Sequence, residues 1–163
     1  MKAVSNSSVL IALSSIGQLE LLNQRFSDGV FIPQAVWKEV VETGSGRPGA
    51  NQVANASWLT ICPVNNLNLV SLLRLELDEG ESEAIALSLE QPNSAILLDE
   101  KNARGVAKRM NLSPLGTVGI LIWAKQNRLI STLKEQLDAL QTVGKFRLSY
   151  SVYQEALKNV GEL

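Results

Sequence analysis

The sequence contains no histidine, and this absence removes several classes of catalytic chemistry. Without histidine there is no Ser-His-Asp or Cys-His catalytic arrangement and no histidine-based zinc site. The single cysteine, Cys62, excludes an internal disulfide and a cysteine-based zinc site, and it fits a reducing cytoplasm. Any enzymatic activity must therefore rest on carboxylates. Carboxylates that lack a nucleophile or base as partner indicate a hard cation such as Mg²⁺ or Mn²⁺.

The sequence also lacks long apolar runs and a strong charge imbalance. No run approaches the roughly 18 apolar residues of a membrane span, so no membrane association is expected. The chain of 163 residues is 45% hydrophobic and only 19% charged, which predicts one folded domain over residues 1–163. The formal net charge of −1 neither predicts nor excludes a nucleic-acid partner, because nucleic-acid binding depends on a local basic face.

Short apolar segments alternate with helical patterns along the whole chain. Strands are expected at residues 2–5, 29–32, 58–62 and 95–98. Helices are expected, among other places, at residues 34–42, 101–110 and 114–126. The C-terminal part is expected to contain a last strand at residues 146–149, between helices at 132–140 and 152–159. This alternation predicts an α/β domain with a mostly parallel central sheet flanked by helices.

Asp99 follows the most apolar of the expected strands. The run Ala95-Ile96-Leu97-Leu98 is bounded by turn residues on one side and stops at Asp99 on the other. Functional sites of parallel sheets form just beyond the carboxyl ends of such strands, which is where Asp99 is expected to lie. The structural alternative is that Asp99 caps the helix that follows. One side chain can do both, so Asp99 is a candidate metal ligand.

Glu81 and Glu83 belong to an acidic stretch that precedes an apolar helical run. Asp78 and Glu81 have the spacing of a capping box, which gives Glu81 a purely structural explanation. That explanation does not extend to Glu83. Residues two apart on a regular helix point roughly 200° apart, so both glutamates can reach one site only if Glu81 precedes the regular helix. The pattern predicts that at least one of them is a ligand and leaves open which.

Two further acidic-site candidates and one basic stripe have competing interpretations. Glu39 interrupts an apolar helix face and, taken alone, would be a solvated glutamate. Asn6 ends the first expected strand and, taken alone, would be a turn or a cap. A basic stripe on one helix face, formed by Lys101, Arg104 and Lys108, is either solvated or placed to contact phosphates near Asp99.

Taken in order, these residues resemble a PIN domain, the small metal-dependent ribonuclease fold found in bacterial toxins. Within it the sequence is most similar to DUF3368, a family of predicted nucleic-acid-binding proteins. The resemblance is carried by four stretches: VSNSSVLIALSSIGQLELL, FIPQAVWKEVV, LDEGESEAIALSLE and ILLDEKNARGVAKRMNLSPLGTVGILIWAK. They run from about residue 4 to residue 126 in the order and spacing of the family. The resemblance implies a single PIN-like domain, a central parallel sheet flanked by helices, and a preference for RNA.

The resemblance also implies a set of site residues. Metal-binding and catalytic positions correspond to Asn6, Glu39, Glu81, Glu83 and Asp99, while Ser8, Glu100 and Thr117 correspond to accessory polar groups. The departure is Asn6, because PIN nucleases normally carry an aspartate at that position. An amide provides a neutral oxygen, so the change removes one charge from a hard-cation site and should weaken metal binding.

The expected function is therefore a PIN-like, Mg²⁺- or Mn²⁺-dependent endoribonuclease that cleaves RNA phosphodiester bonds. By resemblance it would be the toxin of a cytoplasmic toxin–antitoxin pair. Its expected partners are RNA, a small antitoxin protein and a second copy of the chain. The alternative is a catalytically weakened or inactive module that binds nucleic acid or protein, because Asn6 replaces the usual aspartate. A phosphotransferase is less consistent with the sequence, since Asn6 stands where such proteins place a nucleophilic aspartate.

Overall fold

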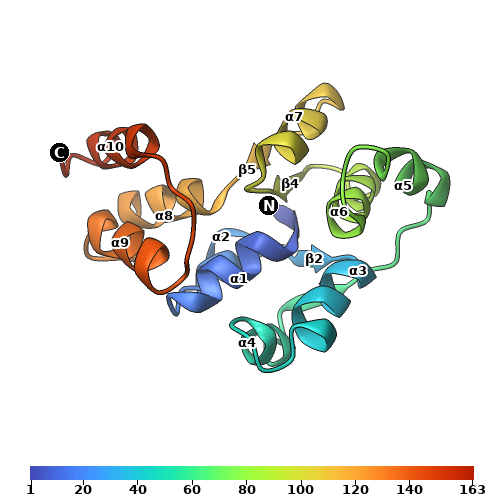
Figure 1. Cartoon of the computed structure of the whole chain (residues 1–163), viewed down its shortest axis with the longest axis horizontal. Coiled ribbons are helices and arrows are strands. Elements are labelled where there is room, and N and C mark those ends of the chain that lie inside the picture. Colours follow the sequence, from blue (N-terminus) through green and yellow to red (C-terminus); the bar gives the residue numbers. More distant parts are fainter.

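A five-stranded, all-parallel sheet forms the centre of the computed structural model, which describes every residue from Met1 to Leu163 (Figure 1). The strand order across the sheet is β3-β2-β1-β4-β5. The strands are β1 (Lys2–Ser5), β2 (Val30–Ile32), β3 (Leu59–Ile61), β4 (Ser94–Leu97) and β5 (Pro114–Leu115). All four pairings between neighbours are parallel, so the predicted α/β class with a parallel sheet is confirmed.

Helices separate and follow the strands, as the alternating sequence pattern predicts. In chain order they are α1 (Ser7–Ser15), α2 (Glu20–Arg25), α3 (Gln34–Trp37), the π-helix η1 (Lys38–Thr43), α4 (Ala50–Ala54), α5 (Leu67–Leu73), α6 (Glu79–Glu90), α7 (Lys101–Arg109), α8 (Thr117–Gln126), α9 (Leu133–Thr142) and α10 (Tyr150–Asn159). None of them combines the length and the apolar character that a membrane crossing requires.

The two faces of the sheet are covered by two separate hydrophobic cores. Alternate residues of one strand point to opposite faces, so Ala3 belongs to the larger core and Val4 to the smaller one. The larger core also contains residues of α1, α8 and α9, and the smaller core is built from α5, α6 and α7 (Figure 1). Because both faces are buried, the inner residues of the central strands, such as Ala3 and Val4 in β1, are apolar on both sides.

The sheet contains one topological switch point, between β1 and β4. From β1 the chain proceeds to β2 and β3 on one side, and it later returns to β4 and β5 on the other. Helix α1 then packs in the larger core and α7 in the smaller one, so the two helices leave the strand ends toward opposite faces. Such an arrangement opens a crevice at the carboxyl ends of the two strands. Asn6 and Asp99 follow those two ends, and the Asn6 backbone N–H donates to the Leu97 carbonyl at 3.1 Å.

Two predictions on the C-terminal part are wrong in detail. The helix expected at 114–126 begins only at Thr117, because Pro114 and Leu115 form the edge strand β5. Proline is tolerated there since an edge strand leaves one row of N–H groups unused. Residues 146–149 are extended but pair with no strand. Their alternating pattern arises because Phe146 and Leu148 pack against the larger core while Arg147 is exposed.

Candidate functional site

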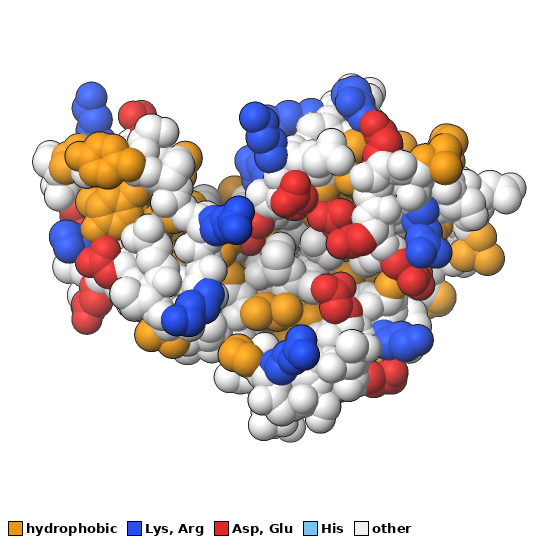
Figure 2. Space-filling view, in the orientation of Figure 1, with side chains coloured by type: hydrophobic (Ala, Val, Ile, Leu, Met, Phe, Trp, Pro, Cys, Tyr) orange, Lys and Arg blue, Asp and Glu red, His pale blue; other side chains and the backbone are white.

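A cavity of about 390 Å³ lies at the switch point of the sheet. Its lining includes Asn6, Ser8, Glu39, Asp78, Glu81, Asp99, Glu100 and Arg147. We call it the acid cavity, because five of its side chains are carboxylic acids and Arg147 is the only basic one. Figure 2 shows acidic side chains gathered near the middle of this face, with basic side chains around them. The structure thus brings Asn6, Glu39, Glu81 and Asp99 to one place from four separate elements.

Asp99 is the most firmly positioned carboxylate of the cavity. The Thr117 backbone N–H donates to its Oδ1 and the Thr117 hydroxyl to its Oδ2, both at 2.7 Å. Burial raises the pKa of Asp99, while the Thr117 hydrogen bonds, the Arg104 charge and Ser8 act in the opposite direction. A Cβ atom on Gly116 would lie 2.9 Å from Asp99 Oδ1, so only glycine leaves room for the carboxylate in this position.

Glu39 is presented to the cavity by the π-helical segment η1, and Asn6 by the end of β1. π-Helical turns are rare and often mark functional sites. The Ser7 hydroxyl donates to Glu39 Oε2 at 2.9 Å and so orients an otherwise exposed side chain. A Cβ atom on Gly80 would lie 3.2 Å from Glu39 Oε2 and 3.3 Å from Asn6 Oδ1. Both oxygens therefore lie over the same glycine, and Asn6 itself is only 5% exposed.

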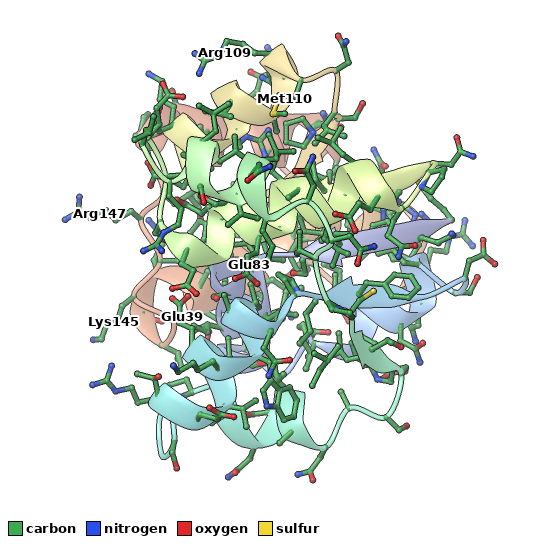
Figure 3. All side chains as sticks on the ribbon, turned by 90° about the vertical axis from the view of Figure 1, so that its right-hand side faces the viewer. Glu39, Glu83, Arg109, Met110, Lys145 and Arg147 are labelled. Atoms are coloured by element: carbon green, nitrogen blue, oxygen red, sulfur yellow. The ribbon has the colours of Figure 1, made fainter.

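Glu81 and Glu83 have different environments, and only Glu81 lines the acid cavity. Glu81 lines the acid cavity and also completes the predicted capping box with Asp78. Burial raises the pKa of Glu81, the hydrogen bond from the Asp78 backbone lowers it, and the nearby carboxylates raise it again. Glu83 does not line the cavity. Its Oε1 accepts the Ala35 backbone N–H at 3.2 Å, so Glu83 satisfies an unpaired donor in the first turn of α3 (Figure 3).

The structure places some of the predicted accessory and basic residues at the acid cavity and others away from it. Ser8 and Glu100 line the acid cavity, and the buried Ser8 hydroxyl lies close enough to Asp99 to lower the pKa of that carboxylate. Lys101 and Lys108 are exposed on α7 and line no part of the cavity. Arg104 points back to the strand end, where its Nη1 donates to the Leu98 carbonyl at 2.9 Å. The three basic residues therefore do not act as one stripe.

Sequence analysis missed five residues that line the cavity: Ser7, Ile11, Asp78, Phe146 and Arg147. Asp78 has a sufficient structural explanation as the N-cap of α6, which hides any second role. Arg147 lies far along the chain from the other cavity residues, and no local pattern connects it to them. The alternation around Phe146 was the available signal, but it indicates an extended segment without indicating what that segment covers.

The chemistry of the donor set suits a small divalent cation, although the carboxylates are not already gathered around one point. No group of three or more Asp, Glu, Cys or His side chains has a geometry that could hold a metal ion. Mg²⁺ does not require such a group, because it commonly binds through one or two carboxylates, several waters and a substrate phosphate. Glu39, Asp99 and the Asn6 amide oxygen provide that kind of set. The Ser8 hydroxyl in the same cavity is a further oxygen that a ligand or its water could contact.

Comparison with known proteins gives one match. A family model described as DUF3368, PIN domain, matches residues 2–162. The match covers nearly the whole chain and so includes the C-terminal residues beyond 126. No curated protein matches this sequence.

Proposed function

Because the chain belongs to the DUF3368 family of PIN domains, we propose that it is an Mg²⁺- or Mn²⁺-dependent endoribonuclease that acts on single-stranded RNA. PIN domains are generally nucleases and generally depend on divalent metals. The observation that carries the proposal is the acid cavity at the switch point, where Glu39, Asp99 and Asn6 meet in a setting that suits a hard cation.

Glu39, Asp99 and Asn6 would hold the cation, and Glu81 would add negative charge beside them. A divalent ion in this place would lower the pKa of a water molecule and offset charge on the phosphate that the water attacks. The protein's own contribution is to fix the ligands beforehand. Thr117 holds both oxygens of Asp99, and Ser7 holds one oxygen of Glu39. Ligands held in this way need little reorganisation when the ion and RNA bind.

Cleavage of a labelled single-stranded RNA, with Mn²⁺ or with EDTA, tests this function. We expect Mn²⁺-dependent cleavage by the wild type and at least a 100-fold loss in Glu39→Gln and in Asp99→Asn, since each removes one ligand charge (about 2.7 kcal/mol of barrier). Glu135→Gln is the matched control, because Glu135 is exposed on α9, away from the cavity. Equal activity in EDTA, or in both cavity variants, would reject the proposal.

The proposed function extends to a role as a toxin. We propose that the enzyme is the toxin of a toxin–antitoxin pair, that a small antitoxin protein inhibits it, and that it self-associates in the cytoplasm. The family resemblance supports the first three points, and the single cysteine is compatible with the last. Growth arrest on expression, relieved by the product of a neighbouring gene, is the expected result.

A second function, a binding module without catalysis, is favoured by one observation. Asn6 supplies a neutral oxygen at a position buried against Glu39, where an aspartate would add a charge to the cation site. Calorimetric titration with Mn²⁺ distinguishes the two functions. The nuclease requires binding that Asp99→Asn abolishes, whereas the binding module predicts RNA binding without measurable Mn²⁺ affinity.

A further inference from the structure

A second and larger cavity, of about 990 Å³, lies directly beside the acid cavity. One wall is formed by the end of β5 and the start of α8, and the other by residues 146–149. These residues together with Lys145 are called the C-terminal strap. The two cavities share three residues, Asp99, Phe146 and Arg147. A ligand bound in the acid cavity would therefore lie beside the second one, with Arg147 at the boundary. We call the second cavity the strap groove.

The C-terminal strap is anchored by its apolar residues and presents its basic residues. Phe146 and Leu148 pack against the larger core, and the Phe146 backbone N–H donates to the Leu140 carbonyl at 2.9 Å. Lys145 and Arg147 are exposed. Figure 3 shows both basic side chains extending outward at the same edge of the molecule as Glu39. The strap thus holds two cations in front of the acid cavity on a backbone that the core fixes.

The lining of the strap groove is mainly apolar and basic, whereas that of the acid cavity is mainly acidic. Its charged residues are Arg104 and Arg147 together with the shared Asp99. The Arg104 guanidinium already donates a hydrogen bond to the Leu98 carbonyl. The Arg147 side chain forms no hydrogen bond and no ion pair, so the Arg147 guanidinium is available to a ligand. The remaining surface is partly apolar, with Leu115 and Phe146 among the lining residues. An anionic group beside a flat apolar group would satisfy both features.

We propose that the strap groove is the subsite for the RNA nucleotide next to the scissile phosphate, with Arg147 binding the phosphate between the two cavities and Phe146 contacting the base. This inference rests on the proposed ribonuclease function. Arginine matches phosphate geometry, and aromatic side chains contact unpaired bases regardless of their sequence. The bases of a duplex are hidden by stacking and pairing, so the groove selects single-stranded RNA.

An acidic peptide is the competing occupant of an arginine-lined apolar groove. Nucleic acid is favoured because the groove adjoins the cavity proposed to hold a scissile phosphate, and Arg147 borders both. A chain of phosphates spaced along one strand fits a cation at that boundary. An unrelated peptide site would have no need to share Asp99 and Arg147 with the acid cavity.

The test is the binding of a short fluorescein-labelled oligouridylate, measured by anisotropy in EDTA so that no cleavage occurs. Variants are Arg147→Ala, Arg147→Lys and Phe146→Leu. Arg74→Ala is the matched control, because Arg74 is an exposed arginine at the end of α5 that borders neither cavity. We expect Arg147→Ala to weaken binding about tenfold and to reduce the slope of log K against log salt by about 0.7, the value for one phosphate contact on a single strand.

Arg147→Lys should recover the salt slope but only part of the affinity, because a lysine keeps the charge without the planar fork. Phe146→Leu should weaken binding without changing the slope. If Arg147→Ala binds RNA as tightly as Arg74→Ala and with the same slope, the proposal is overturned and an acidic peptide becomes the better occupant. Absence of RNA binding by the wild type at low salt overturns it as well. Failure of the wild type to cleave RNA, with binding still dependent on Arg147, refutes the nuclease function alone.

Discussion

Thr117 donates hydrogen bonds to both carboxylate oxygens of Asp99, one from its backbone N–H and the other from its hydroxyl, each at 2.7 Å. Thr117 is fully buried, and the two residues follow neighbouring strands, β5 and β4. The pair therefore couples two strand ends and fixes the carboxylate that the acid cavity depends on. Glu39 is held less firmly, by one hydrogen bond from the Ser7 hydroxyl to its Oε2.

Thr117→Val should weaken this arrangement without removing bulk. The backbone N–H remains, but Asp99 loses a hydroxyl that lowers its pKa, so that pKa should rise further above its ordinary value. The free energy of unfolding should fall by about 1 to 3 kcal/mol, the cost of a lost hydrogen bond to a charged group. Urea unfolding measures this, with Thr60→Val on the exposed side of β3 as control. An unchanged stability would mean that the hydroxyl contributes nothing.

The pH dependence of stability should reveal Asp99 in the metal-free protein. Its folded-state pKa is raised, so the folded protein binds more protons than the unfolded chain at mildly acidic pH. The contribution of Asp99 to stability is then largest near and below the unfolded pKa of about 4, and it is lost as pH rises through the folded pKa. Glu81, whose pKa is also raised, acts in the same direction.

Asp99→Asn should remove the part of the pH-dependent loss of stability that the ionisation of Asp99 causes. Without metal, the variant should be at least as stable as the wild type at neutral pH, and the difference should vanish in acid. With Mn²⁺ present the wild type alone should be stabilised, because ligand binding to the folded state adds RT ln(1 + [L]/Kd). Denaturant titrations over a pH series measure both effects. A variant that is equally destabilised at every pH would show that Asp99 is mainly a structural residue.

Glu81→Gln and Glu83→Ala should have opposite consequences. Glutamine preserves a capping box, so Glu81→Gln should leave stability nearly unchanged while it lowers Mn²⁺ affinity. Glu83→Ala leaves the Ala35 N–H without its acceptor and should cost about 1 kcal/mol of stability, with no change in Mn²⁺ affinity. Thermal unfolding and calorimetry on the same samples measure the pair. A loss of metal affinity in Glu83→Ala alone would exchange the roles assigned to the two glutamates.

Asn6→Asp should strengthen the cation site. The substitution restores a charge beside Glu39 at almost constant volume, and Asn6 is buried. We expect Mn²⁺ affinity to rise about tenfold, which corresponds to about 1.4 kcal/mol. Without metal the same charge should destabilise the fold, since it repels the neighbouring carboxylates. Asn51→Asp on exposed α4 is the control. Unchanged affinity relative to a measurable wild type would mean that the amide is already an adequate ligand.

Local signatures in the sequence were sufficient for four of the five strands and for Asp99 and Glu81 as candidates, whereas Glu39 and Asn6 became candidates only through the family resemblance. The apolar run before Asp99, the capping-box spacing at Asp78 and Glu81, and the strand–helix alternation are each visible within a few residues. The edge strand β5 was missed because two residues, one of them Pro114, are too few to show a pattern. The π-helical geometry of η1 could not be predicted either, since its sequence is that of an ordinary helix.

The remaining differences come from contacts between distant parts of the chain. Glu83 differs from Glu81 only through the position of Ala35, which lies 48 residues earlier. Arg147 enters the site because Phe146 and Leu148 pack on the larger core and carry the strap past Asp99. Local sequence contains no information on either contact. Tertiary packing therefore decided which polar residues face the acid cavity.

Titration of the wild-type protein with Mn²⁺, followed by the electron paramagnetic resonance signal of the free ion, tests the cation site most directly. The account predicts saturable binding that Glu39→Gln and Asp99→Asn each weaken at least tenfold, about 1.4 kcal/mol, because each removes a ligand charge. Glu83→Gln should bind like the wild type, since its oxygen can still accept the Ala35 N–H. Wild-type protein that leaves the free Mn²⁺ signal unchanged, or undiminished binding in the Glu39→Gln and Asp99→Asn variants, would contradict the acid cavity as the metal site.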